Sequence, residues 1–312
     1  MNLNYPKMVM RASIIRQISL IVVALSIFST TYSQLWTRYR TEMFIGGGAS
    51  QMLSDLGGGP GEGRNDIRDM DLEATNYSAT IGVRYKISDY VSGRLSFSHL
   101  QSLASDEYTE NPSRSNRNLS VRTNIFEFSP MVEFYLLREN IPMNRTLSRR
   151  YRHYGQGGDF SIYMATGFTT LYFNPQAQLN GTWHDLQPLG TEGQGLETGN
   201  GKYSRFTFGL PVGIGFKYSM TRHWSISLEG QARFTASDYL DDVSTDYYDN
   251  QEIRDAYGPV AAELANRRLD GGGGEGGIRG NPENNDVYMF LEFHLSRRFD
   301  SSKRRGGIRR SF

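Results

Sequence analysis

The sequence predicts an all-β protein, a closed antiparallel eight-stranded transmembrane β-barrel of the outer-membrane type with long extracellular loops. Three observations predict this fold. Apolar and polar residues alternate over eight segments, aromatic residues recur at the ends of these segments, and short and long connections separate them. The mean hydropathy of −0.52 is compatible with such a barrel, because only alternate strand residues face lipid while the interior and loops are polar.

Residues 1–33 have the pattern of a signal peptide. Three basic residues precede an apolar run at 18–28, and Thr31 and Ser33 stand at the −3 and −1 positions of the expected cleavage point. An uncleaved anchor is the alternative, but the run is shorter than the roughly 20 apolar residues that a spanning helix needs. The chain has no Cys, so we expect neither a lipid anchor at that point nor disulfides.

Eight segments carry the alternation that is typical of a strand with two different faces. In the clearest of them, 205–218, Phe206, Phe208 and Leu210 begin one apolar face, while small and polar residues form the other. The remaining segments are 42–53, 77–87, 91–104, 121–137, 160–172, 224–234 and 287–299. A soluble sandwich is the alternative, but it gives no reason for aromatic residues to recur at strand ends, where a bilayer has its aromatic girdles.

The connections predict the orientation of the barrel. Residues 88–90 and 219–223 form short turns, whereas four connections are long and polar, at 54–76, 105–118, 173–204 and 235–285. Outer-membrane barrels have short periplasmic turns and long external loops. We therefore expect a barrel over 34–299 in the outer membrane, both termini in the periplasm, and a basic periplasmic tail at 300–312.

One connection on the periplasmic side, 138–159, is anomalously long and carries the predicted partner-binding residues. Arg145, Arg149, Arg150 and Arg152 lie there, whereas the outer connection at 235–255 is acidic. The predicted charge is therefore basic toward the periplasm and acidic outward. This pattern indicates a periplasmic docking surface for an acidic partner, and mere solvation of exposed turns is the alternative.

The predicted interior of the barrel is charged with both signs. Seven charged residues alternate onto the inward faces: Arg84, Arg94, Glu127, Glu133, Glu229, Arg233 and Glu292. An eight-stranded barrel is just wide enough for side chains to fill it, and unpaired buried charges are too costly. We therefore expect these residues to pair and plug the barrel, which excludes a conducting pore.

The residues predict no catalytic, cofactor or metal site. The five His show no metal-ligand spacing, and the acidic residues at 238–249 do not match the EF-hand loop; whether they bind a divalent ion stays open. His99 and Ser102 resemble the pair of barrel enzymes that deacylate lipid A, but two residues separate them and no carboxylate is placed to orient the His. A girdle His explains His99 better, and we expect no enzyme.

Six strings of loop residues carry a resemblance over nearly the whole mature chain. They are 116–122 (NRNLSVR), 173–177 (FNPQA), 185–195 (DLQPLGTEGQG), 238–244 (DYLDDVS), 258–262 (GPVAA) and 279–282 (RGNP). In this order they resemble the PorG-like outer-membrane proteins of Bacteroidota, which are associated with the type IX secretion system. Related barrels of uncharacterised role share some of these strings.

The resemblance implies a non-enzymatic component of the type IX secretion and gliding machinery. Such a component anchors a periplasmic lipoprotein-containing ring, with PorK- and PorN-like partners, to the outer membrane. Outer-membrane lipid and lipopolysaccharide are further expected partners, nucleic acid is not, and no cofactor is implied. The alternative is a general structural or small-ligand-binding barrel of the OmpA or OmpX type.

Overall fold

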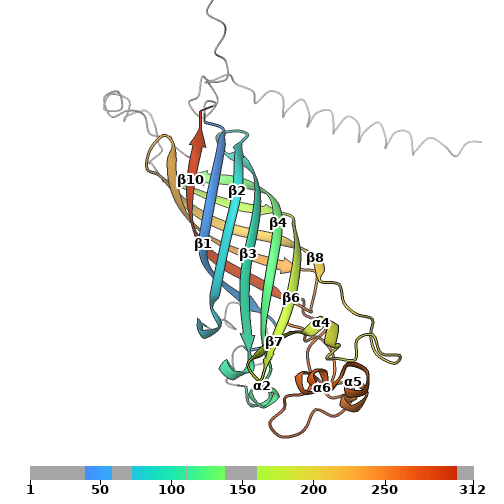
Figure 1. Ribbon diagram of the computed structural model, residues 1–312. Helices are drawn as coiled ribbons and strands as arrows, with labels where there is room; N and C mark the ends of the chain where they lie inside the picture. The colour runs from blue at the N-terminus through green and yellow to red at the C-terminus, as the bar shows by residue number, and fades with distance from the viewer. Residues whose placement is uncertain (1–38, 58–71, 110, 138–159, 301–312) are drawn as a thin grey trace, which may run out of the picture. The chain divides into compact units, whose positions relative to one another are not determined.

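One antiparallel sheet dominates the computed structural model, which describes residues 39–57, 72–109, 111–137 and 160–300 (Figure 1). These residues belong to the compact unit Arg38–Phe312. The sheet has ten strands: β1 (Thr41–Leu53), β2 (Asn76–Lys86), β3 (Val91–Ser105), β4 (Ser120–Leu137), β5 (Phe160–Gly167), β6 (Thr169–Leu179), β7 (Thr182–Asp185), β8 (Phe206–Ser219), β9 (Trp224–Thr235) and β10 (Val287–Phe299).

Strand pairing closes this sheet into a ring. The order β3-β2-β1-β10-β9-β8-β5-β4 returns to its start because β3 also pairs with β4. The first and last strands lie side by side along their whole length, from Thr41 opposite Phe299 to Leu53 opposite Val287. The backbone groups of every ring strand thus find partners on both sides.

Strands β5 and β6 together fill one of eight positions in the ring, so the predicted arrangement of eight is confirmed. The predicted strand 160–172 is nevertheless broken at Phe168, whose N–H donates to the Pro130 carbonyl at 3.1 Å. Pro130 has no N–H to return that bond. A side chain at Gly167 would also lie 2.3 Å from the same carbonyl oxygen. The missing N–H of Pro130 on β4 therefore explains why the neighbouring strand is divided into β5 and β6.

Strand β6 runs on to Leu179 and turns into β7, so the prediction of a loop over all of 173–204 was wrong. Asn180 and Gly181 form the turn, both with positive φ, as a two-residue hairpin requires. The alternation of 173–179 continues the pattern of β6, with Phe173 and Ala177 buried. The hairpin extends the sheet past the ring on one side.

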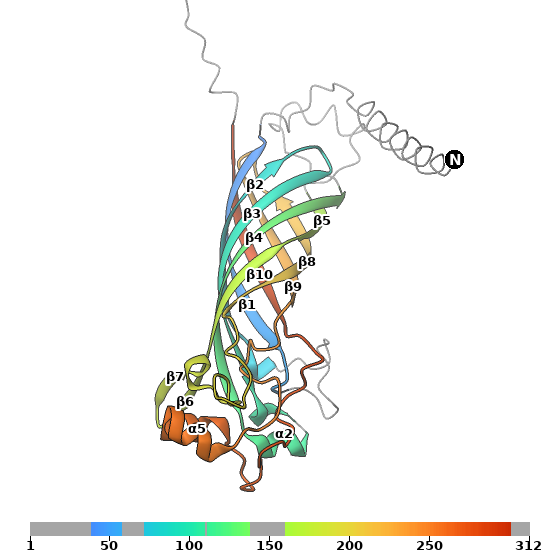
Figure 2. The same ribbon diagram turned by 90° about the vertical axis from the view of Figure 1, so that its right-hand side faces the viewer.

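The long connections lie at one end of the ring, which we call the loop end. Four short α-helices lie there, beside the β6–β7 hairpin (Figures 1 and 2). They are α2 (Pro112–Arg117), α4 (Leu186–Leu189), α5 (Asn250–Tyr257) and α6 (Pro259–Ala265). Asp249 caps the N-terminus of helix α5, because its carboxylate accepts hydrogen bonds from two backbone N–H groups in the first turn of the helix. Among the described residues, no helix is both long and apolar enough to span a membrane.

An apolar core fills the loop end of the ring. Leu100, Ile125 and Phe173 point inward from β3, β4 and β6, and each has no exposed surface. They pack with Leu240 of the connection after β9 and with Tyr288 of β10. The loops are thus packed onto the sheet by hydrophobic burial.

A buried ion pair lies directly beneath this core. The Arg233 guanidinium donates to both carboxylate oxygens of Glu127, at 3.1 and 2.8 Å, and the Tyr288 hydroxyl donates to Glu127 at 2.5 Å. Both charged side chains are almost completely buried. Neither side chain has access to water, so the charge of each is compensated by the charge of the other.

We expect Arg233→Met to destabilise the protein by about 3–5 kcal/mol, because it leaves the Glu127 carboxylate buried without its counter-charge. The double variant Arg233→Met/Glu127→Gln removes both charges, and the Gln oxygen can still accept from Tyr288. It should cost clearly less than the single variant. Urea unfolding in lipid vesicles measures both, and equal losses would show that the ion pair does not matter.

Candidate functional site

The half of the ring interior that lies nearest the short turns holds a network of charged side chains centred on two arginines. Arg84 donates through Nε to Glu133 at 2.7 Å and through Nη1 to Glu42 at 2.9 Å. Arg94 donates through Nη1 to both oxygens of Glu229 at 2.8 Å and to Glu133 at 3.2 Å. All five side chains are at least nine-tenths buried. The two guanidinium groups therefore share three carboxylates.

Further polar groups complete this network. Lys217 donates to Glu42 at 2.7 Å, the Tyr163 hydroxyl donates to Glu229 at 2.6 Å, and His294 lies 3.0 Å from Glu292. A hollow of about 10 Å³ remains beside Lys217, which is room for about one water molecule. The seven charged residues predicted to face inward are all buried. Six of them pair with opposite charges inside the ring, as predicted, whereas Glu292 contacts His294 and accepts from the Thr80 hydroxyl.

The loop end of the ring is covered by a second buried polar assembly, which we call the cap. It is formed by residues 54–57, 105–109, 111–119, 185–203 and 236–286. Arg117 donates to both oxygens of Asp106, at 2.8 and 2.7 Å, and Arg279 donates to Glu192 at 2.7 Å. Arg279 also donates to the Asp242 carbonyl. Arg117 also donates to the Asp55 and Arg279 carbonyl groups, so each arginine ties together connections that are far apart in the sequence.

The loop strings noted in the sequence lie mainly in this cap. Arg117, Glu192, Asp242 and Arg279 each belong to one of them, and all four are buried. Asp242 has a positive φ of 63°, and its carboxylate accepts from the Thr191 and Tyr203 hydroxyl groups. The strings therefore have a structural explanation: they supply the internal contacts of the cap.

Burial shifts the ionisation of several cap carboxyl groups. It raises the pKa of Asp238 to about 8 and that of Asp242 to about 6. It also raises the pKa of Asp241, with the Asp55 charge adding to the shift, and it raises the pKa of Asp286 far above its ordinary value. Desolvation penalises the ionised form of each group.

The outward face of the ring carries an apolar band between two rows of aromatic residues. At the loop end, His99 stacks on Phe126 with ring centres 4.4 Å apart, and Tyr172 contacts Phe206. The next outward residues toward the loops on these two strands are Gln101 and Asn124. Their side chains are amides, and Gln101 donates to Asn124. The other row includes Tyr85, Phe134, Tyr218 and Trp224, all more than a third exposed.

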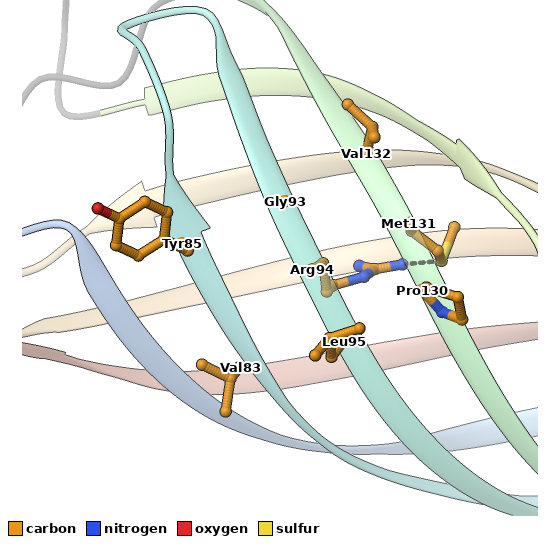
Figure 3. Close-up of a pocket in the computed structure, with 8 residues that line it drawn as sticks. All are labelled: Val83, Tyr85, Gly93, Arg94, Leu95, Pro130, Met131 and Val132. Atoms are coloured by element: carbon orange, nitrogen blue, oxygen red, sulfur yellow. Dashed lines mark hydrogen bonds between the residues drawn. The ribbon is translucent and has the colours of Figure 1, made fainter.

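A shallow hollow of about 390 Å³ lies on this band between β2, β3 and β4 (Figure 3). Gly93 forms its floor because it has no side chain, and Val83, Leu95 and Val132 lie around it. The one charged residue at its edge, Arg94, is buried and is bound to Glu229. The other polar group at its edge is the Tyr85 hydroxyl, which accepts from Arg40 at 3.4 Å.

The structure separates the two residues that were considered as an enzyme pair. His99 lies on the outward face of β3, against Phe126 and Tyr77, whereas Ser102 is fully buried on the inward face. Residues three apart in a strand point to opposite faces. The two side chains cannot act together, and His99 has the position that was expected of a girdle residue.

The predicted acidic outer surface is only partly correct. Asp246, Glu252 and Asp255 are exposed, but Asp238, Asp241 and Asp242 are buried inside the cap. Sequence reasoning missed this because a cluster of acids in a loop normally faces water. The apolar Leu240 and Val243 between them were the available signal, since both are completely buried.

The predicted partner-binding residues Arg145, Arg149, Arg150 and Arg152 lie outside the described residues, as do the signal peptide and most of the basic tail. In the described part of the chain, no three His, Asp or Glu side chains are arranged to hold a metal ion.

The raised pKa values predict that cap stability falls as the pH rises from about 4 toward about 8. Over this range the folded cap binds more protons than the open chain does, so deprotonation favours opening. Asp55 opposes the ionisation of Asp238 and Asp241, and Glu192 opposes that of Asp238 and Asp242. Arg117 favours the ionisation of Asp241, and Arg279 favours that of Asp242.

Hydrogen exchange of residues 236–286, corrected for intrinsic rates and with a chelator present, should show less protection at pH 8.5 than at pH 6. Protection of β2 and β3 serves as the control and should not change. Asp238→Asn should reduce the difference, and equal protection of the cap at both pH values would contradict the prediction.

The comparison with known protein families agrees with this architecture. The model of the family described as "Outer membrane protein beta-barrel domain" matches residues 20–254, whereas no curated protein matches the sequence significantly. Solved structures with similar folds include Neisserial surface protein A (9% identity, 83% of this chain, 97% of that chain, TM-score 0.39). The attachment invasion locus protein Ail of Yersinia pestis is 10% identical over 84% of this chain and 99% of its own, with a TM-score of 0.37.

The N-terminal barrel domain of Pseudomonas aeruginosa OprF is 8% identical over 84% of this chain and 98% of that chain, with a TM-score of 0.33. Similarities this low carry no functional argument. The family match covers most of the chain, from within the predicted signal peptide through β9 to helix α5 of the cap. The chain belongs to the outer-membrane protein β-barrel domain family, which indicates an outer-membrane location.

Proposed function

We propose that this protein is a closed, non-conducting and non-enzymatic transmembrane barrel with a structural role in the outer membrane. The observation that carries this proposal is the filled interior. Three groups of side chains fill the interior along the axis of the ring. They are the network around Arg84 and Arg94, the Glu127–Arg233 pair and the apolar core. Both ion pairing and hydrophobic packing would have to be broken to admit a solute.

The apolar band supports a transmembrane position. Its aromatic borders lie at Tyr77 and Tyr85 on β2, and at Phe206 and Tyr218 on β8, which is a separation of 8 to 12 residues. A tilted strand needs about 9–11 residues to cross the hydrocarbon core. The outward side chains between these borders are apolar, as contact with lipid requires.

The connection lengths support an orientation with the cap outside the cell. The short turns, the start of β1 and the end of β10 lie at the same end of the ring, and the cap lies at the other end (Figure 2). Long connections are extracellular in barrels of this type, and short turns are periplasmic.

In planar bilayers the purified protein should give no stable conductance at neutral pH. Reproducible single-channel current steps would contradict the proposal that the interior is filled. The same protein should be verified as folded by its resistance to unfolding in detergent at room temperature, so that a silent record is not due to misfolding.

Introduced cysteines test the orientation, because the natural chain has none. Glu263→Cys lies at an exposed position of helix α6 in the cap, and Met220→Cys lies on an exposed short turn. A membrane-impermeant maleimide should label the first variant in intact cells and the second only after the outer membrane is permeabilised. The reverse pattern would invert the proposed topology.

A second candidate function is the anchoring of a type IX secretion ring, and the ordered loop strings favour it. In this function Arg145, Arg149, Arg150 and Arg152 dock acidic periplasmic ring proteins of the PorK and PorN type. The described cap does not require such a partner, because its string residues are engaged with one another. The anchoring function therefore rests on the resemblance and on the basic connection.

Reversal of these four arginines to glutamate should release the ring proteins from a tagged version of the barrel. Co-purification from the native host measures this loss, and Arg254→Glu on exposed helix α5 is the control for a change in charge. Retention of the ring would exclude docking through this connection. Normal secretion after deletion of the gene would exclude the anchoring function altogether.

A further inference from the structure

A chain of hydrogen-bonded polar side chains runs along the outside of the sheet near the loop end, and we call it the polar belt. It begins on β3, where Gln101 donates to Asn124 of β4 at 2.9 Å, and Asn124 donates to Gln176 of β6 at 3.4 Å. Strands β3, β4 and β6 are neighbours in the sheet. The members of the belt are Gln101, Arg122, Asn124, Asn174, Gln176, Asp185 and Arg205.

The belt continues over the β6–β7 hairpin. Gln176 and Asn174 both donate to the carboxylate of Asp185, at 2.7 and 2.9 Å. Arg122 of β4 donates to Gln176 at 2.7 Å, and Arg205, just before β8, donates to Asn174 at 3.0 Å. The belt thus carries two guanidinium groups against one carboxylate, and this carboxylate is already engaged by two amides.

The belt lies directly beyond the aromatic border of the apolar band. Gln101 is the next outward residue after His99 on β3, and Asn174 is the next after Tyr172 on β6. Aromatic rows lie at the membrane–water interface of a spanning barrel, so the belt falls at the level of the lipid headgroups. This placement rests on the transmembrane position proposed above.

Aromatic rings hold both arginines of the belt in place. The guanidinium carbon of Arg122 lies 3.7 Å from the centre of the Trp183 ring, and that of Arg205 lies 5.4 Å from the centre of the Tyr172 ring. A guanidinium that stacks on a ring keeps its N–H groups at its edge, where they can donate to another molecule. Trp183 is 36% exposed, so it presents apolar surface beside Arg122.

The belt has hydrogen-bonding capacity that its internal contacts do not use. Each of its four amides donates one hydrogen bond within the belt, and each arginine donates one. An amide has two N–H groups and a guanidinium has five. None of the seven side chains is fully buried. A polar ligand beside the belt therefore meets a row of available donors.

We propose that the polar belt binds the headgroup of lipopolysaccharide in the outer leaflet of the membrane. This headgroup is a phosphorylated glucosamine disaccharide, and the belt offers groups for both of its parts. Amides donate to and accept from sugar hydroxyl groups. Arg122 and Arg205 suit phosphate, because a guanidinium can donate two parallel hydrogen bonds to phosphate oxygens. The continuity of the belt with the apolar band identifies a lipid as the ligand, since acyl chains on the band place their headgroup at the belt.

The belt occupies one side of the ring, so binding is confined to that side. It covers β3, β4, β6 and β7, whereas the outward residues near the loop end of β1, β9 and β10 include Ala49, Phe234 and Met289. These apolar side chains offer no hydrogen bonds to a headgroup. The inference deepens the structural role proposed above, because it names the lipid class and the residues that hold it.

Binding of purified diphosphoryl lipid A to the refolded mature protein tests the proposal. The protein is held in a neutral detergent with a chelator, so that divalent cations do not bridge protein and lipid. Native mass spectrometry counts the lipids bound at each concentration. We expect saturable binding that is stronger than that of phosphatidylglycerol, which carries phosphate but no sugar. Equal or stronger binding of phosphatidylglycerol would overturn the choice of lipopolysaccharide as the ligand.

Arg122→Gln and Arg205→Gln should each weaken lipid A binding about tenfold, because each removes hydrogen bonds to a charged phosphate. Arg297→Gln is the matched control, since Arg297 is an exposed arginine that lies over Trp224 and Phe299 at the other border of the band. It should bind lipid A as the wild type does. If one belt variant fails to fold, the other decides the test.

Unchanged binding in the folded belt variants, or an equal loss in Arg297→Gln, would overturn the proposal. Insertion of the same proteins into phosphatidylcholine vesicles separates this failure from a failure of the proposed function. A barrel that inserts but binds lipid A without the belt keeps its transmembrane role. A barrel that does not insert contradicts that role itself.

Discussion

The pairing of β1 with β10 is the constraint on which the rest of the structure depends. It closes the sheet, and closure removes every free strand edge from the ring. Closure at eight positions also leaves an interior only wide enough for side chains. The inward charges must then be compensated by other inward side chains, since little room for solvent remains in the ring.

The interior meets this requirement in different ways at its two ends. Toward the short turns, Arg84 and Arg94 share carboxylates from several strands, so that no charge depends on a single partner. Toward the loops, Leu100, Ile125 and Phe173 belong to an apolar core. The ion pair of Glu127 and Arg233 lies at the boundary, and Tyr288 of the core donates to it.

The cap shows the same principle in an incomplete form. Arg117 and Arg279 neutralise two of its seven buried carboxyl groups, and hydroxyl groups support a third. The other four have no buried guanidinium group of their own. Burial raises the pKa of each of these four groups, so that protons are their compensating charge in the cap.

The sequence by itself determined the strands, because a strand with lipid on one side and packed polar residues on the other has a strict period of two. The inward positions of Arg84, Glu127 and Glu229 followed from that period alone. Tertiary structure decided the break at Phe168, which depends on Pro130 of the neighbouring strand. It also decided which acids of the 238–242 segment are buried, because loops have no period from which burial can be read. Local pattern sets the two faces of a strand, but only the packing of distant loops decides the environment of a loop carboxylate.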